Sequence, residues 1–328
     1  MKSFLGKCAK AFLWALTGTL FAAQSHGAIV PLRGEAPENY VWVAAHRAAW
    51  QHAPENSIPA LKYALAFGAD IIETDVRMTA DGHVVIMHDY SVDRTTDGNG
   101  LVSRMTLAEI KKLRLKTNWG GNTQFQVPTL DEYLSVVRGK AYLYLDKAGY
   151  DLPGNATGTL IRKLLEILKK HNALEEAIFV SDWPHAKAKE VFGNDLERVI
   201  YCPVISDTVP NLDAYVNEYL EKLKPVAFQF RMASENSKTF RLLPRILDSG
   251  SKAFVAATWA NHTAGHDDRA SFFDSPDNGW GWLTPQGFSL IETNFPRDLI
   301  NYLRTQKKAL SAACFPRRSQ KENKNPFE

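Results

Sequence analysis

The sequence predicts an α/β protein, a (β/α)8 TIM barrel with two loop insertions at its C-terminal face. Short apolar runs rich in β-branched and aromatic residues alternate with helical patterns along the chain. Such alternation is typical of a parallel sheet with helical crossovers, and the number of runs favours closure into a barrel. Residues 1–27 have the pattern of a cleaved leader, as described below, and without them the chain has 328 − 27 = 301 residues. That length exceeds the roughly 250 residues of a typical barrel by about two loop insertions.

Nine runs have strand character and compete for eight barrel positions, so one of them lies outside the barrel. In chain order they are 41–45, 70–73, 84–87, 141–145, 177–180, 198–204, 225–230, 252–258 and 288–291. Helical patterns such as SIPALKYALAFG and GTLIRKLLEILKKH lie between many of them. The segments 90–140 and 259–287 are predicted to be the insertions. Both follow the C-terminal end of a strand, where barrel enzymes carry their sites.

The N-terminus resembles a secretory signal peptide over residues 1–27. Lys2, Lys7 and Lys10 precede an apolar core, and small residues follow it, as in a cleaved export signal. The core is shorter than the ~18 residues of a membrane span, so we expect no stable membrane anchor. The barrel domain is then 28–315, and the charged segment 316–328 is expected to be disordered. A periplasmic or secreted location follows from this interpretation.

Charge and cysteine content exclude some classes of partner. Removing the three lysines of the leader from 39 basic residues leaves 36 against 36 acidic ones. Nothing in this balance indicates a nucleic-acid partner or a polybasic membrane patch. Only Cys202 and Cys314 remain after the leader. One disulfide is possible in an oxidising compartment, but two distant thiols are more often a buried cysteine and a loose one.

Ionisable side chains follow the apolar run at 70–73. Glu73 and Asp75 are two residues apart, so on a strand they point to the same side. Two carboxylates at one barrel mouth repel each other unless a cation lies between them, and an all-oxygen ligand set suits calcium or magnesium. The alternative is ordinary ion pairing with Arg77 or with nearby lysines.

The neighbouring runs end in the same manner. His46 and Arg47 end the first run, His88 ends the third, and Asp146 and Lys147 end the fourth. Two histidines beside carboxylates are the residues that a general acid and a general base across a phosphate require. Asp146 can complete the oxygen ligand set, and a lysine can neutralise a phosphoryl oxygen.

These residues lie in blocks that resemble the glycerophosphodiester phosphodiesterases, barrel enzymes related to phosphoinositide-specific phospholipase C. The blocks are AHRAAWQHAPENSIPAL, IIETDVRMTADGHVVIMHDYSVDRTTDGNGLVSRMTLAEIKKL, VPTLDEYL and LDKAGYD, and the resemblance runs from about residue 41 to IETNFP. It implies a barrel with bound calcium or magnesium that splits glycerophosphodiesters into glycerol 3-phosphate and an alcohol. It further implies that His46 and His88 transfer protons, that Glu73 and Asp75 hold the metal, and that Arg47 and Glu55 serve the substrate.

Three positions depart from the family pattern. Ala48 stands where a glycine usually follows His-Arg, and Asn294 stands where an aspartate is usual. The shorter DKA, with Asp146 directly before Lys147, resembles a branch that also carries GHDDRA and GWGWL. We read these changes as altered substrate fit.

The segment 259–287 is rich in tryptophan. Trp259, Trp280 and Trp282 can form a pocket wall against the alcohol half of the substrate or can merely anchor a long loop. We take Trp280 and Trp282 as candidate substrate contacts. GHDDRA is read as a polar loop with a capped helix start rather than a second metal site.

The predicted function is metal-dependent hydrolysis of small-molecule glycerophosphodiesters by paired-histidine acid–base catalysis. Two alternatives stay open. The first is a phospholipase that acts on intact phospholipid or phosphoinositide, which requires an exposed apolar rim at the pocket. The second is a family member that binds phosphodiesters without cleaving them. The sequence does not decide the oligomeric state.

Overall fold

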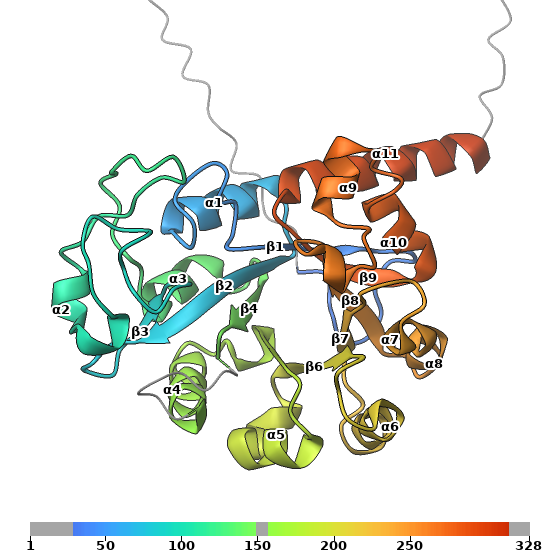
Figure 1. Ribbon diagram of the computed structural model, residues 1–328, viewed down its shortest axis with the longest axis horizontal. Coiled ribbons are helices and arrows are strands. Elements are labelled where there is room, and N and C mark those ends of the chain that lie inside the picture. The colour runs from blue at the N-terminus through green and yellow to red at the C-terminus, as the bar shows by residue number, and fades with distance from the viewer. Residues whose placement is uncertain (1–28, 149–156, 315–328) are drawn as a thin grey trace, which may run out of the picture.

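Eight parallel strands close into a barrel, which confirms the predicted fold class (Figure 1). The structure is a computed structural model that describes residues 29–148 and 157–314. The barrel strands are β1 (Trp42–Ala45), β2 (Ile71–Met78), β4 (Tyr142–Asp146), β5 (Ala177–Ser181), β6 (Ile200–Ser206), β7 (Ala227–Arg231), β8 (Lys252–Ala256) and β9 (Phe288–Thr293). The barrel is closed because β1 pairs with both β9 and β2. The predicted leader and the tail 316–328 lie outside the described residues.

Of the nine predicted runs, 84–87 is the one that lies outside the barrel. β3 (Val84–Ile86) pairs antiparallel with the far end of β2, with Val76 opposite Ile86. The sequence analysis placed His88 at the end of a strand beside the other site residues. In the structure this strand is not one of the eight barrel strands. His88 follows a short strand that returns beside β2. His88 nevertheless reaches the site, because β2 (Ile71–Met78) extends beyond the barrel and β3 pairs with the extended part.

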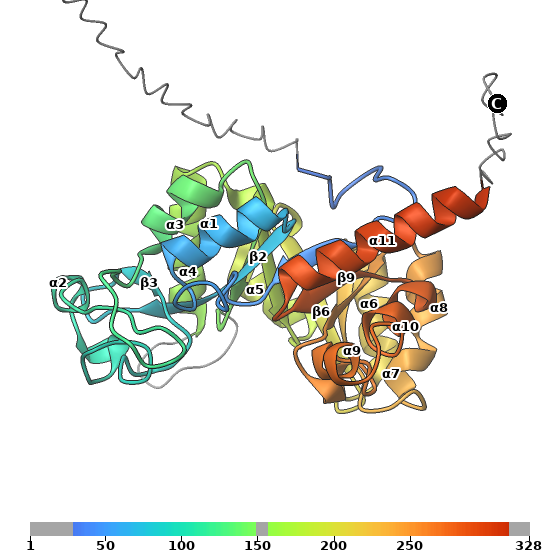
Figure 2. The same cartoon turned by 90° about the horizontal axis from the view of Figure 1, so that it is seen from above.

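Helices cover the outside of the barrel. Their bounds are α1 (Ile58–Phe67), α2 (Leu107–Ile110), α3 (Leu130–Val137), α4 (Thr157–Lys170), α5 (His185–Phe192), α6 (Leu212–Lys222), α7 (Lys238–Arg241), α8 (Leu243–Asp248), α9 (Asp268–Phe273), α10 (Trp280–Gln286) and α11 (Pro296–Cys314), with single 3-10 turns at 102–104, 174–176, 193–197 and 260–262. α11 lies against α1, β1 and β9 (Figure 2).

Local sequence signals set several helix ends. Ser57 caps the start of α1, and Gly68 ends it in the left-handed conformation that glycine adopts without strain. Thr129 and Glu132 form a reciprocal capping box at the start of α3.

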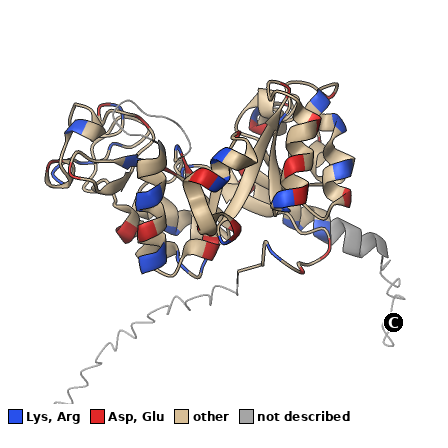
Figure 3. Cartoon of the chain, turned by 90° about the horizontal axis from the view of Figure 1, so that it is seen from below, with Lys and Arg blue, Asp and Glu red and all other residues tan. Residues whose placement is uncertain are grey.

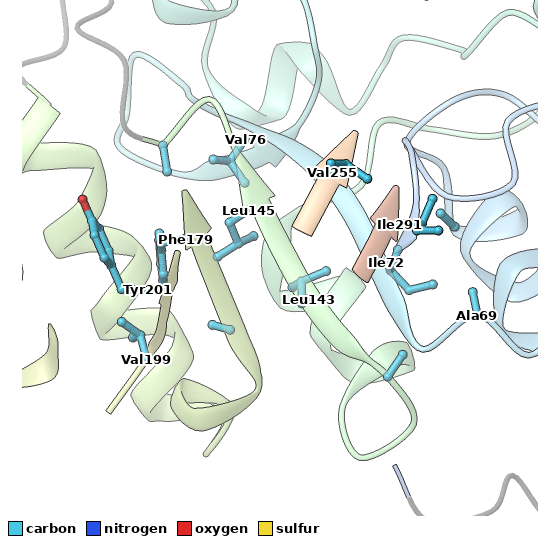
Figure 4. Packing of buried hydrophobic residues seen from close by; sticks show 14 of the residues in the cluster. Ala69, Ile72, Val76, Leu143, Leu145, Phe179, Val199, Tyr201, Val255 and Ile291 are labelled. Atoms are coloured by element: carbon cyan, nitrogen blue, oxygen red, sulfur yellow. The ribbon is translucent and has the colours of Figure 1, made fainter. Parts of the chain in front are cut away.

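The strands bury both of their faces. Ile71 belongs to the apolar cluster inside the barrel, and the next residue, Ile72, belongs to the larger cluster between barrel and helices. Figure 4 shows side chains of the outer cluster, including Val76, Leu143 and Phe179 from three different strands. Because successive side chains alternate, every second residue of a strand points into the barrel. Inside, Leu32 and the free cysteine Cys202 are fully buried in the apolar cluster.

The first predicted insertion exists, but its bounds differ from 90–140. The chain between β2 and α3 holds β3 and α2 and has an apolar cluster of its own that includes Val92, Ile110 and Val127. α3 (Leu130–Val137) is the ordinary crossover helix between β2 and β4. The insertion therefore ends before residue 130, and it extends to the side of the barrel (Figure 1).

The second predicted insertion is the crossover from β8 to β9. It holds α9 and α10, and α10 packs against β9. It therefore contains helices rather than being a free loop. Its helix α10 packs on the barrel as a crossover helix does.

Charged side chains of both signs are interspersed over the helices (Figure 3). Among the described residues, no helix is both long and apolar enough to cross a bilayer.

Candidate active site

The alternation of side chains along each strand builds the site. On β2 the inward side chains are Ile71, Glu73 and Asp75, and the first of these lies in the apolar interior. β4 presents Tyr142, Tyr144 and Asp146 in the same order, with Asp75 and Asp146 paired across the two strands. Each strand thus fills the barrel floor with apolar groups and delivers a carboxylate to its C-terminal mouth.

Three carboxylates converge at this mouth. Glu73, Asp75 and Asp146 each offer an oxygen within 4.8 Å of the others. Glu73 and Asp75 are 1% and 0% exposed, respectively, so water does not screen their charges. One oxygen of each, Glu73 Oε1 and Asp75 Oδ1, has no hydrogen-bond partner. Buried acceptors without partners are rare in proteins, and a set of oxygen ligands with two such free acceptors is an environment that suits a hard cation. The residues therefore fit the predicted metal.

The electrostatics of the site agree with this fit. Burial, together with Asp75, Glu292 and Asp146, raises the pKa of Glu73 well above its ordinary value. Burial would also raise the pKa of Asp146, but the adjacent Lys147 outweighs it and the pKa is lowered. Lys147 Nζ lies 2.5 Å from Asp146 Oδ2 and 3.7 Å from Asp75 Oδ1. One lysine thus compensates two of the carboxylates and leaves Glu73 the least compensated.

The hydrogen bonds of His46 determine its tautomer. Asn294 Oδ1 lies 2.8 Å from His46 Nδ1 and also accepts a hydrogen bond from Trp50 Nε1 at 3.1 Å. An indole N–H can only donate, so the side-chain oxygen of Asn294 must face both rings. His46 Nδ1 therefore carries the proton, and Nε2 keeps a free lone pair. Burial, with help from Arg47, lowers the pKa of His46 to about 4, so the ring is neutral at ordinary pH.

His88 has a charged hydrogen-bond partner instead of a neutral one. Its Nδ1 lies 2.6 Å from Asp89 Oδ1. Hydrogen bonds from Arg94 and from His88 hold the pKa of Asp89 well below its ordinary value. The two histidines therefore differ in the partner of Nδ1, which is a neutral amide oxygen for His46 and an ionised carboxylate for His88.

Arg94 joins the two histidine environments, and the sequence analysis missed it. Its guanidinium donates to both oxygens of Glu55, at 2.8 and 2.7 Å, and also to Asp89 at 2.7 Å. Glu55 in turn lies 3.2 Å from Arg47 Nη1. The stretch SVDRTTDG gives no local sign of this role. Arg94 lies in the inserted segment, and its partner Glu55 lies far away in sequence, in the loop before α1.

The turn after β1 carries local strain. Arg47 and Ala48 both have positive φ, 49° and 61°, which explains why glycine is usual after His-Arg. The conformation aims the backbone N–H of Arg47 at Glu73 Oε2, 2.6 Å away. Ala48 keeps this geometry at a cost of about 1–2 kcal/mol for a left-handed residue with a Cβ atom.

Glu292 is a second residue that the sequence analysis missed. It lies on β9, is 5% exposed, and places Oε1 4.0 Å from His46 Nε2. It also forms a cluster with His46 and Glu73. Burial and the nearby Asp146 raise the pKa of Glu292 to about 8. The strand-end rule that identified Glu73 in IIETD would have identified Glu292 in SLIETN.

Two cavities are lined by residues of the candidate site. The larger, about 450 Å³, is lined by residues that include His46, Arg47, Trp50, Glu55 and Trp259. The smaller, about 370 Å³, is lined by Arg77, His88, Asp89, Tyr90 and Lys147. The two histidines thus face different cavities.

Neither of the two predicted tryptophan contacts lines these cavities. Trp280 is 2% exposed and donates from Nε1 to Asp268, 2.9 Å away. Trp282 stacks on His266 with ring centroids 3.8 Å apart. The structure does not bring these two predicted side chains to the cavities, because α10 turns them toward the helix layer. Trp259, which is 56% exposed, is the tryptophan of this segment that reaches the cavity.

The fold and the site define a parallel barrel whose mouth carries converging carboxylates, with two histidines that line separate cavities. The model of the glycerophosphoryl diester phosphodiesterase family matches residues 46–252. The chain belongs to this family.

Relatives and solved structures agree with the assignment. A glycerophosphodiester phosphodiesterase of Caldanaerobacter subterraneus is 40% identical over 153 residues, which are 45% of this chain and 60% of that protein. The chain spans less than two thirds of the length of the curated relatives it matches first.

Two solved structures have the same fold. A Parabacteroides distasonis glycerophosphoryl diester phosphodiesterase has a TM-score of 0.65 at 21% identity, covering 85% of this chain and 91% of that one. An Oleispira antarctica phosphodiesterase, solved with its product sn-glycerol-3-phosphate, has a TM-score of 0.59 at 26% identity, covering 80% and 96%.

Proposed function

We propose that this protein hydrolyses glycerophosphodiesters to glycerol 3-phosphate and an alcohol. The observation that carries the proposal is a pair of histidines that line two cavities and have different Nδ1 partners, a neutral amide oxygen for His46 and an ionised carboxylate for His88, in a site that also holds the cluster of Glu73, Asp75 and Asp146. A phosphate held between them would meet a proton acceptor on one side and a proton donor on the other.

His46 is the general base in this proposal. Its Nε2 lone pair takes a proton from the nucleophile, either a glycerol hydroxyl or water, while Asn294 holds Nδ1–H. His88 is the general acid and gives its proton to the leaving alcohol. Asp89, fixed by Arg94, keeps the His88 ring oriented. The alcohol half then occupies the cavity of His88 and Tyr90, and the glycerol half occupies the cavity of His46 and Trp259.

Glu73, Asp75 and Asp146 would hold the divalent cation, calcium or magnesium. When bound, it neutralises charge on the phosphoryl oxygens. Arg47 and Lys147 add fixed positive charge around the phosphate, where negative charge builds as the diester reacts. Glu55 orients Arg47 through the contact at 3.2 Å.

A second candidate substrate is a diester that carries an acyl chain. Trp119 is 94% exposed, and its neighbours Asn118 and Gly120 line the larger cavity together with Trp259. Exposed tryptophans are common where proteins meet lipid interfaces. This rim is the feature that the phospholipase alternative requires.

The leader pattern supports export, so the proposed site of action is periplasmic or secreted. N-terminal sequencing of the mature protein from its native host tests this: a chain that still begins at Met1 would contradict it.

The function is tested with a panel of glycerophosphodiesters that carry choline, ethanolamine, glycerol and inositol groups. Release of glycerol 3-phosphate is measured with and without calcium or magnesium. Parallel assays use a lysophospholipid and an intact phospholipid. Release from the small diesters supports the proposal, and release only from the lipids supports the second candidate. Binding without release from any substrate contradicts both.

A further inference from the structure

A buried carboxylate outside the catalytic mouth has no role in the chemistry above. Asp268 is the first residue of α9, in the crossover from β8 to β9, and is 2% exposed. The neighbouring cation Arg269 does not neutralise it, since Arg269 pairs with Asp267 at 2.9 Å. Burying a charge is costly unless hydrogen bonds compensate it. The hydrogen bonds of Asp268 therefore indicate what it stabilises.

Three donors surround Asp268. Oδ1 accepts from Thr293 Oγ1 at 2.6 Å and from Trp280 Nε1 at 2.9 Å, and Oδ2 accepts from the backbone N–H of Asn294 at 2.8 Å. Two of these donors belong to Thr293, the last residue of β9, and to Asn294, which follows it. The carboxylate thus fixes the end of this strand to the helical segment that precedes it.

The end of β9 is also what holds His46. The carbonyl of Thr293 accepts from the backbone N–H of His46 at 3.1 Å, and the side chain of Asn294 accepts from His46 Nδ1. Asp268 therefore binds both of the residues that contact His46. One of them, Thr293, helps to place the ring, and the other, Asn294, selects its tautomer. A shift of Thr293 and Asn294 would move the ring directly.

We propose that Asp268 is a positioning residue that holds Thr293 and Asn294 so that Asn294 can fix His46 with its Nδ1 protonated. The crossover that contains GHDDRA is thereby a structural support of the candidate base rather than a metal site. This inference rests on the proposed function for its kinetic consequence but not for its structural one.

Replacement of Asp268 by asparagine gives a specific conflict. If the new NH₂ takes the place of Oδ2, it faces the backbone N–H of Asn294, which can only donate. If it takes the place of Oδ1, it faces the indole N–H of Trp280, which also can only donate. Either orientation sets donor against donor, and a buried donor without a partner is destabilising. The β9 end must move to relieve it.

Asp267 provides a matched control. It is also buried, at 3% exposed, and adjacent in sequence, but its side chain caps α9 through the N–H of Ala270 and does not contact β9. Asparagine is as good a helix cap as aspartate. D267N should therefore leave the support of His46 intact.

The experiment compares D268N and D267N with wild type by steady-state kinetics and thermal melting. We expect D268N to lower kcat roughly 10-fold to 100-fold with KM changed less than about threefold, the scale of a small misplacement of a catalytic group. D267N should keep kcat within about twofold. A melt confirms that both variants are folded. Equal kcat values in folded D268N and D267N would overturn the inference.

A second measurement does not depend on activity. The nitrogen chemical shifts of histidine report the tautomer, and the His46 signal is assigned by its loss in H46Q. D268N should lose the pure Nδ1-protonated signature, whereas D267N should retain it. If D268N does not fold, T293V, which removes one donor to Asp268, takes its place with a smaller expected effect. A wild type inactive on every diester would contradict the proposed function, and an unchanged His46 signal in these variants would contradict this inference.

Discussion

His46 and His88 differ in what holds them. An amide oxygen fixes His46 as a neutral ring, and an ionised carboxylate faces His88. In the proposed function one histidine is the base and the other is the acid. We therefore expect their variants to differ in activity when the leaving group of the substrate is changed, which separates the two roles.

The first prediction separates the acid from the base. H46A and H88A should each lower kcat roughly 10²-fold or more on a glycerophosphodiester with an alkyl leaving group, the scale of a positioned proton-transfer group. With a p-nitrophenyl leaving group, which departs without protonation, H88A should recover most of its activity and H46A should not. The measurement is kcat for both substrates in both variants. Recovery of H46A instead would reverse the assignment.

Ala48 gives a second prediction at this scale. Its positive φ costs about 1–2 kcal/mol that glycine would not pay, whereas Ala49 in the same turn does not have a positive φ. Both side chains are buried, so each replacement by glycine loses a comparable methyl group. A48G should therefore be less destabilising than A49G by about 1–2 kcal/mol in urea unfolding. Equal losses would show that the turn is not strained.

At the scale of elements, the inserted segment after β2 and the crossover before β9 border the two cavities. Tyr90, 52% exposed, belongs to the first and lines the cavity of His88. Trp259 belongs to the second and lines the cavity of His46. The acid–base assignment therefore predicts which half of the substrate each residue contacts.

The third prediction follows from this division. Y90A should change the ranking of head groups in kcat/KM, because the leaving alcohol lies beside His88. W259A should raise KM for all head groups in proportion, because it borders the glycerol half. W282A is the control, since Trp282 lines neither cavity, and it should lower thermal stability without altering the ranking. A changed ranking in W259A with none in Y90A would place the two halves the other way round.

At the scale of the whole molecule, the mouth of the barrel concentrates buried negative charge from β2, β4 and β9. The raised pKa values of Glu73 and Glu292 have a consequence for stability without metal. A carboxyl group whose folded pKa is raised contributes most to stability at low pH and loses that contribution as pH rises.

The fourth prediction concerns metal removal. The metal-free protein should lose stability as pH rises from about 4.5, the ordinary pKa of a glutamate, through about 8, the pKa of Glu292. Calcium or magnesium should remove this loss and raise Tm, since ligand at 100 times Kd adds about 2.7 kcal/mol. E73Q should raise metal-free stability and abolish the metal-dependent rise in Tm. E166Q, at an exposed carboxylate on α4, should do neither. If the Tm of the wild type did not change with metal, the proposal that these carboxylates bind a divalent cation would be contradicted.

The sequence by itself determined the class of fold and most of the chemistry at the mouth. Period-two alternation along an extended strand is a local property, so IIETD alone places Glu73 and Asp75 on one side of β2. The apolar runs likewise gave all nine strands, because burial on both faces selects continuous apolar segments in a parallel sheet.

Only the tertiary structure decided which groups meet. β3 folds back beside β2, so His88 reaches the site from outside the barrel. Arg94 joins Glu55 to Asp89, and Asp268 reaches the end of β9, across gaps in sequence that no local pattern encodes. Trp280 and Trp282 were misplaced for the same reason, because the face that a short helix buries depends on the barrel it packs against. Barrel closure brings β9 beside β1, and that contact alone places Asn294 against His46.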